Sequence, residues 1–202
     1  MSRLEVDEGS EDATLVAACR SGHSEAFGIL VRRHQKIMLN LAYRLLGNLE
    51  EACEVVQDAF VAAHRGLPGF RGEARFSTWL AAITLNQARN RLARTARRRR
   101  NEAFSLDEPL AGTEGRVLPD PASPAPSALE DLETRALRRQ LEACIRALPL
   151  EYREALVMRD LQDRSYLDIG LILKVQEGTV KSRIFRARES VKTCLRRALG
   201  AP

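Results

Sequence analysis

Apolar residues recur along most of the chain at the three- and four-residue spacing that is typical of amphipathic α-helices. Gly47 and Asn48 end the longest of these stripes, and Asp12 or Thr14 is placed to cap the first. The region before residue 100 lacks the alternating pattern that indicates strands. The spacing therefore predicts an all-α protein. The expected helices cover residues 12–19, 24–46, 50–65, 76–100, 129–148 and 151–160.

Residues 165–188 predict two short helices joined by a tight turn. Ser165 can cap the first helix, and Asp168 follows it at the spacing of a capping box. Residues 174–176 form the expected turn, and the second helix begins near Glu177. Two helices joined in this way form a helix-turn-helix.

The second helix of this pair separates an apolar face from a basic one. Val180, Ile184 and Ala187 share the apolar side. The other positions offer cations, a hydroxyl and an aromatic ring, which suit the edges of base pairs in a DNA major groove. An ordinary amphipathic pair with a solvated basic face has the same spacing, but the turn length and the near absence of acid favour DNA recognition. The outward residues are Lys181, Ser182, Arg183, Phe185, Arg186 and Arg188.

Charge is segregated along the 202-residue chain, although the net charge is only +5. An arginine-rich tract closes the predicted helix over 76–100, and eight acidic residues with five prolines follow between residues 101 and 133. The prolines exclude a regular helix, so this segment is expected to be an extended, mobile linker. The predicted organisation is a disordered N-terminus (1–11), a helical domain (12–100), a flexible acidic linker (101–128) and a helix-turn-helix domain (129–200).

The four cysteines lie far apart and form no Cys-x-x-Cys pair, so neither a disulfide framework nor a zinc site is indicated. We expect Cys19, Cys53, Cys144 and Cys194 to be reduced thiols of a cytosolic protein. The first twelve residues are polar and acidic, unlike a signal peptide. Because no apolar run has membrane-spanning length, we expect a soluble, cytoplasmic protein without membrane insertion.

A second basic cluster combines Phe70 and Arg71 of a glycine-rich loop with Trp79, Asn86 and Arg89 of the helix that follows. Aromatic rings stack on unpaired bases, and cations follow the phosphates. An amide such as that of Asn86 can read the edge of a base taken out of the duplex. The neighbouring apolar residues favour a core position for Trp79, and the spacing leaves Asn86 open between base reading and a solvated amide.

Enzymatic chemistry finds no support in the sequence. The three histidines have no metal-ligand spacing, and neither a phosphate-binding glycine loop nor a His-Glu-x-x-His motif is present. We therefore expect no enzymatic activity, no bound metal and no cofactor.

Three segments resemble the extracytoplasmic-function (ECF) sigma factors, group 4 of the bacterial sigma-70 family. Residues 51–60 (EACEVVQDAF) are similar to the core-polymerase-binding helix of that family. Residues 70–80 (FRGEARFSTWL) resemble its loop and promoter-melting segment. Residues 148–156 (LPLEYREAL) and 165–188 resemble its C-terminal DNA-binding domain.

This resemblance implies a dissociable specificity subunit without polymerase chemistry of its own. The implied partners are core RNA polymerase, through its β′ clamp helices and β flap, promoter DNA and an anti-sigma factor. Contacts to β′ are implied for Val56, Gln57, Asp58 and Phe60. Contacts to the −10 element are implied for Phe70, Arg71, Trp79, Asn86 and Arg89, with Asn86 at the edge of a flipped base. Contacts to the −35 element are implied for Arg159, Thr179, Lys181, Ser182, Arg183, Phe185 and Arg186.

Two other classes of protein remain open at this point. A helix-turn-helix regulator that works without polymerase would share the C-terminal pattern, but residues 12–100 show no ligand-pocket signature. An RNA-binding or scaffold protein could use the arginine tract.

Overall fold

The computed structural model describes residues 7, 9–102 and 128–200, and these divide into two compact units. The described residues contain no strand, and the predicted all-α class is confirmed. Most of the predicted linker lies outside the described residues. The first unit contains α1 (Asp12–Arg20), α2 (Ser24–Leu46), α3 (Leu49–Gly66), the short 3-10 turn η1 (Leu67–Gly69) and α4 (Phe76–Glu102). The second contains α5 (Ala128–Arg146), α6 (Leu150–Leu156), the π-helical η2 (Val157–Leu161), α7 (Tyr166–Leu173) and α8 (Glu177–Ala198).

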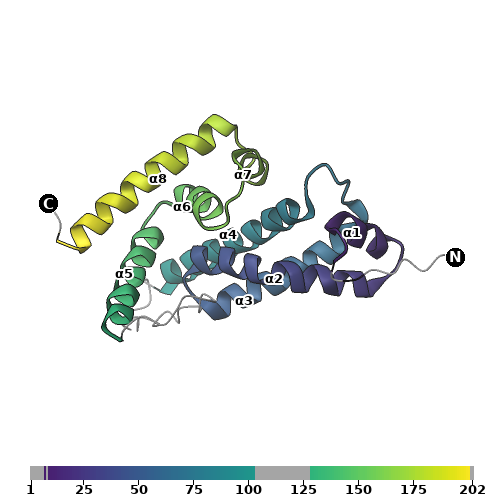
Figure 1. Cartoon of the computed structure of the whole chain (residues 1–202), viewed down its shortest axis with the longest axis horizontal. Helices are drawn as coiled ribbons and strands as arrows, with labels where there is room; N and C mark the ends of the chain where they lie inside the picture. The colour runs from purple at the N-terminus through teal and green to yellow at the C-terminus, as the bar shows by residue number, and fades with distance from the viewer. Residues whose placement is uncertain (1–6, 8, 103–127, 201–202) are drawn as a thin grey trace. The chain divides into compact units, whose positions relative to one another are not determined.

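In the first unit α2, α3 and α4 pack side by side, with α1 against α2 (Figure 1). Fully buried leucines such as Leu30, Leu41 and Leu80 form the core between them. Each such side chain contributes about 1.5–3 kcal/mol by leaving water. The turn between α2 and α3 follows the predicted stop, because Gly47 takes a φ of 77° and the Asn48 side chain accepts a hydrogen bond from the Glu51 amide at 3.0 Å.

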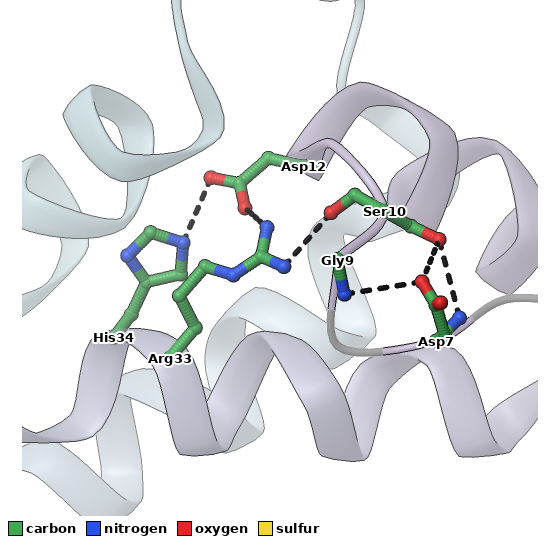
Figure 2. A network of polar contacts seen from close by, with 6 residues as sticks. All are labelled: Asp7, Gly9, Ser10, Asp12, Arg33 and His34. Carbon is green, nitrogen blue, oxygen red and sulfur yellow. Dashed lines mark hydrogen bonds and ion pairs between the residues drawn. The ribbon is translucent and has the colours of Figure 1, made fainter.

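A polar network fixes the start of α1 to α2 (Figure 2). One carboxylate oxygen of Asp12 accepts a hydrogen bond from Arg33 at 2.7 Å, and the other lies 2.8 Å from His34 Nε2. Arg33 also donates to the Ser10 carbonyl at 2.8 Å. Asp12 was expected as a possible helix cap, but Glu11 is the N-cap and makes no side-chain bond. The Asp12 carboxylate joins two helices instead.

In the second unit α5 and α6 both pack against α8. The predicted helix-turn-helix is confirmed in α7 and α8. Ser165 caps α7 by accepting from the Asp168 amide at 3.0 Å. α7 ends at Leu173, and Lys174 after it takes the left-handed conformation, at φ 57°. Gly170 suits this turn, because an added Cβ there would lie 3.0 Å from the Val175 carbonyl oxygen, which is a tight contact.

The cysteine prediction is wrong for one pair. Cys144 of α5 and Cys194 of α8 form a disulfide, with Cα atoms 5.7 Å apart, whereas Cys19 and Cys53 are free. The sequence spacing of 50 residues gave no local motif, and the packing of α5 on α8 brings the two side chains together. Cross-linking such a loop restricts the unfolded chain and so stabilises the folded unit.

Replacing Cys194 with serine is expected to lower the unfolding free energy of the oxidised second unit by about 2–4 kcal/mol, because the cross-link is lost. Hydrogen exchange of α6 and α8 amides in the full-length protein measures this change. Ser190→Ala, exposed on the same helix, is the control and should alter stability by less than about 0.5 kcal/mol. Equal effects of the two substitutions would contradict the stabilising role of the disulfide.

Candidate nucleic-acid and protein interfaces

The outer face of α8 lies opposite the residues that the helix buries against the rest of its unit. Val180, Ile184 and Ala187 are buried and fix the rotation of the helix about its axis. Phe185 is consequently turned outward and is 68% exposed. An aromatic side chain with this exposure is not held by the core and is available to a partner. Thr179, Lys181, Ser182 and Arg186 are also exposed on α8.

Several cations of α8 are held by acids of the same unit. Arg183 pairs with Glu151 of α6 at 2.9 Å and is only 21% exposed. Arg188 makes two hydrogen bonds to Asp160, at 2.6 and 3.0 Å. These arginines link α8 to the preceding segment, so Arg183 has a structural role that sequence reasoning did not anticipate.

Lys181 and Arg159 both lie close to one aromatic ring. The guanidinium of Arg159 is 5.2 Å from the centroid of the Tyr166 ring, and the ammonium of Lys181 is 5.5 Å from it. Glu177 lies 2.9 Å from Lys181 and raises the pKa of that lysine through its hydrogen bond. Sequence reasoning missed Tyr166 as a positioning residue, and its only signal was an aromatic at the first position of α7.

Arg186 and Ser182 each make a hydrogen bond within the unit. Arg186 lies 3.3 Å from the hydroxyl of Tyr152, which raises the pKa of the arginine. Ser182 donates to the Thr179 carbonyl at 2.9 Å, one turn back along the helix. Both side chains are exposed on α8, so each can exchange this bond for one to a ligand.

In the first unit, the loop and α4 residues form an aromatic cluster. Phe70 lies with its ring centroid 4.8 Å from that of Trp79 and 6.3 Å from that of Phe76. Trp79 is half-buried and Phe76 is buried, so the predicted core position of Trp79 is confirmed in part. Phe70 is also half-buried, whereas Arg71 beside it is exposed. The cluster supports the loop at a defined place on α4.

Asn86 and Arg89 lie on the same side of α4 as Trp79. Trp79 and Asn86 are two helical turns apart and therefore share a face, which Arg89 continues. Asn86 is exposed, so its amide is open to solvent in this structure. Arg91, further along, pairs with Glu54 of α3 and is held to the body of the unit.

An apolar groove of about 720 Å³ lies between α2 and α3. The buried side chains of Val56 and Phe60 help to line it, and so does Gln57, whereas Asp58 is exposed outside its lining. Val31 and Leu39 of α2 supply the other wall. Sequence reasoning considered only α3 here, because periodicity does not tell which neighbouring helix shares a groove.

No metal site or membrane span is evident in the part of the chain that the structure describes. No group of three His, Cys, Asp or Glu side chains within it could hold a metal ion. No described helix is both long and apolar enough to cross a bilayer.

Two families of known sequences match the two units. Sigma-70 region 2 matches residues 30–98, which fall in α2 to α4. Sigma-70 region 4 matches residues 138–191, from α5 into α8. The matches fall in the units that carry the aromatic cluster and the helix-turn-helix, respectively.

Curated relatives match almost the whole chain. The RNA polymerase sigma-H factor of Pseudomonas aeruginosa is 35% identical over 92% of this chain and 94% of its own. The ECF RNA polymerase sigma-E factor of Escherichia coli K12 is 34% identical over 92% and 95%, respectively. The ECF RNA polymerase sigma factor SigW of Bacillus subtilis is 34% identical over 88% and 92%.

Two solved structures share the fold. The sigma factor RpoE, solved with the anti-sigma factor NepR from Bartonella quintana, aligns with a TM-score of 0.64 at 21% identity, over 84% of this chain and 96% of that one. CnrH, solved with the cytosolic domain of CnrY, aligns with a TM-score of 0.61 at 28% identity, over 94% and 97%.

A helix-turn-helix unit with a basic outer face, preceded in the chain by a helical unit with an apolar groove, defines a two-part DNA-binding protein of transcription. The chain belongs to the ECF branch of the sigma-70 family. It is an alternative sigma factor that directs transcription initiation, as the resemblance implied. Members of this family are initiation factors that bind core RNA polymerase and promoter DNA.

Proposed function

We propose that the outer face of α8 reads the −35 element of the promoter. The observation that carries this proposal is the exposed Phe185 set among cations on a helix whose opposite face is buried. Arg186 and Lys181 then approach base edges, while Arg159, held on Tyr166, approaches a phosphate. Thr179, Ser182 and Arg183 complete the proposed contact set, with Arg183 first leaving its pair with Glu151.

The loop and α4 of the first unit are proposed to bind the −10 element as a single strand. Phe70 and Trp79 offer ring faces to unstacked bases, and Arg71 and Arg89 offer cations to the strand. Asn86, exposed on the same face of α4, would hydrogen bond the edge of a flipped base. The half-burial of Phe70 and Trp79 supports this assignment, because a stacking platform must keep its rings fixed.

The groove between α2 and α3 is proposed to receive the β′ clamp helices of core polymerase. An amphipathic helix binds an apolar groove by inserting its apolar side chains. Val56, Phe60 and Gln57 lie in that groove, and Asp58 at its margin would meet the polar side of the incoming helix. The β flap would bind the second unit, as the family resemblance implies.

These assignments give each domain a role and suggest a regulatory partner. Residues 12–100 would form the polymerase- and −10-binding domain, and 129–200 the −35-binding domain, acting together in the cytoplasm. A partner anti-sigma factor is also proposed, because both solved relatives described above were captured with a protein that binds them. The acidic segment between the domains would join them as a linker.

Run-off transcription with purified core polymerase tests the proposal as a whole. The protein should direct initiation at defined promoters only when core polymerase is present. Specific promoter binding by the protein alone, with no initiation when core polymerase is added, would instead support the polymerase-independent regulator, which the region 2 match already disfavours. Equal binding of structured RNA and promoter DNA would support the scaffold alternative.

Arg186→Ala should weaken recognition of the preferred −35 sequence by about 1–3 kcal/mol, because a bidentate base contact would be lost. Run-off assays on the preferred promoter and on single-base variants of its −35 element measure the loss. Arg196→Ala removes the same charge from an exposed position of α8 and is the control. If Arg186→Ala weakened every sequence equally, the residue would be a phosphate contact and base reading would be wrong.

Asn86→Ala should leave binding to closed promoter duplex unchanged and reduce strand opening, because the flipped base loses its hydrogen-bonding partner. Permanganate footprinting of the −10 region with holoenzyme reports the opening. Asn40→Ala removes another exposed amide of the first unit and should open the promoter normally. Normal permanganate reactivity with Asn86→Ala would refute the assigned role.

Val61→Asp should reduce affinity for core polymerase by about tenfold or more, because a carboxylate would be buried against an apolar partner helix. Val61 lines the groove and is 43% exposed, so the change should leave the unit folded. Fluorescence titration with core polymerase measures the affinity, and circular dichroism checks helix content. Glu50→Ala, exposed on α3 outside the groove lining, is the control. Unchanged affinity of Val61→Asp would place the polymerase elsewhere.

A further inference from the structure

The disulfide of the second unit is unexpected for a protein that works with RNA polymerase in the cytoplasm. Disulfides in reducing compartments are usually transient and serve catalysis or redox sensing. We propose that Cys144 and Cys194 are a reversible modification site, whose exchange partner is a low-molecular-weight thiol such as glutathione. The cross-link then sets how firmly the DNA-reading unit is held together. This inference rests on the proposed function, which places the unit at the −35 element.

The two cysteines differ in exposure. Cys144 is only 2% exposed, so a small thiol cannot reach it in the folded unit. Cys194 is half-buried and borders an open hollow of about 370 Å³ on α8. Arg197 also borders this hollow and offers a cation to the carboxylates of glutathione, while the charge of Glu189 faces Lys192 at 3.8 Å. Exchange therefore begins at Cys194.

The chemistry balances with a small disulfide as the oxidant. The Cys194 thiolate attacks one sulfur of oxidised glutathione, forms a mixed disulfide and releases one glutathione thiolate. The Cys144 thiolate then attacks the Cys194 sulfur, closes the protein disulfide and releases the second glutathione. Two electrons pass from the protein to the small disulfide, and the two thiol protons pass to the released thiolates. Excess reduced glutathione reverses both steps, entering again at Cys194.

The cross-link matters because α5 has few other buried side chains. Among the α5 side chains whose burial is described, only Cys144 and Ile145 are buried. The other cysteine of the cross-link lies on α8, which is one continuous helix. Cys194 lies about 20 Å along this helix from Lys181. The disulfide therefore acts on DNA reading through the stability of the unit and not through contact with DNA.

Titration of the full-length protein in glutathione buffers tests reversibility. The protein is equilibrated at increasing ratios of reduced to oxidised glutathione, quenched, alkylated and mapped by mass spectrometry, which separates this pair from Cys19 and Cys53. The pair should pass from disulfide to dithiol within the range that these buffers cover. A pair that stays oxidised throughout is structural, and one that stays reduced does not form; either result overturns the proposal.

Single variants test the order of attack. Cys144→Ser should accumulate glutathione on Cys194, because the resolving thiol is absent. Cys194→Ser should carry none on Cys144, which is buried. Equal adducts on both cysteines, or none on Cys194, would overturn the assigned entry point.

Run-off transcription with core polymerase connects the switch to function. The dithiol form should give several-fold less transcript than the disulfide form near the unfolding temperature of the reduced unit. The double variant Cys144→Ser/Cys194→Ser should give the same yield in both buffers, which controls for thiols of the polymerase. Equal yields from both wild-type forms, or redox dependence that persists in the double variant, would overturn the inference. Absence of transcription from both forms would count against the proposed function, while the glutathione titration would still decide reversibility.

Discussion

The burial of a narrow apolar stripe on α8 is the constraint on which the helix-turn-helix unit depends. Val180, Ile184 and Ala187 hold one rotation of the helix, and every outward side chain is placed by that choice. Gly170 allows the turn to pass close to α7, so the two helices keep a fixed angle. A helix that could rotate would present its cations to no defined base.

Several cations on this surface have a partner within the same unit. Arg183 and Arg188 pair with acids of the same unit, and Tyr166 steadies Arg159 and Lys181. Exposed ion pairs contribute at most about 1 kcal/mol each, so they orient side chains without locking them. Such contacts keep the basic face ordered, and under the proposed function phosphates would replace the acids when DNA binds.

Under the proposed function, neither DNA-binding surface needs to bind strongly by itself. Two modest sites on one chain act at a high effective concentration once the first is bound, and attachment to polymerase fixes their spacing. The groove between α2 and α3 fits this division of labour, since it lies on another part of the first unit than the aromatic cluster of Phe70 and Trp79. A cross-link that stabilises only the second unit would then adjust one of the two contacts.

The sequence by itself determined the all-α class, the Ser165 cap, the turn before α8, the family and the outward position of Phe185, because these depend on short-range spacing. It did not show that the helix predicted over 151–160 changes after Leu156 to the π-helical η2. The tertiary structure alone decided the Cys144–Cys194 bond, the α2 wall of the groove and the link from Asp12 to Arg33 and His34. Helical periodicity shows which side of a helix is buried but not which other helix covers it. Contacts between residues far apart in the chain therefore appear only when the helices are packed.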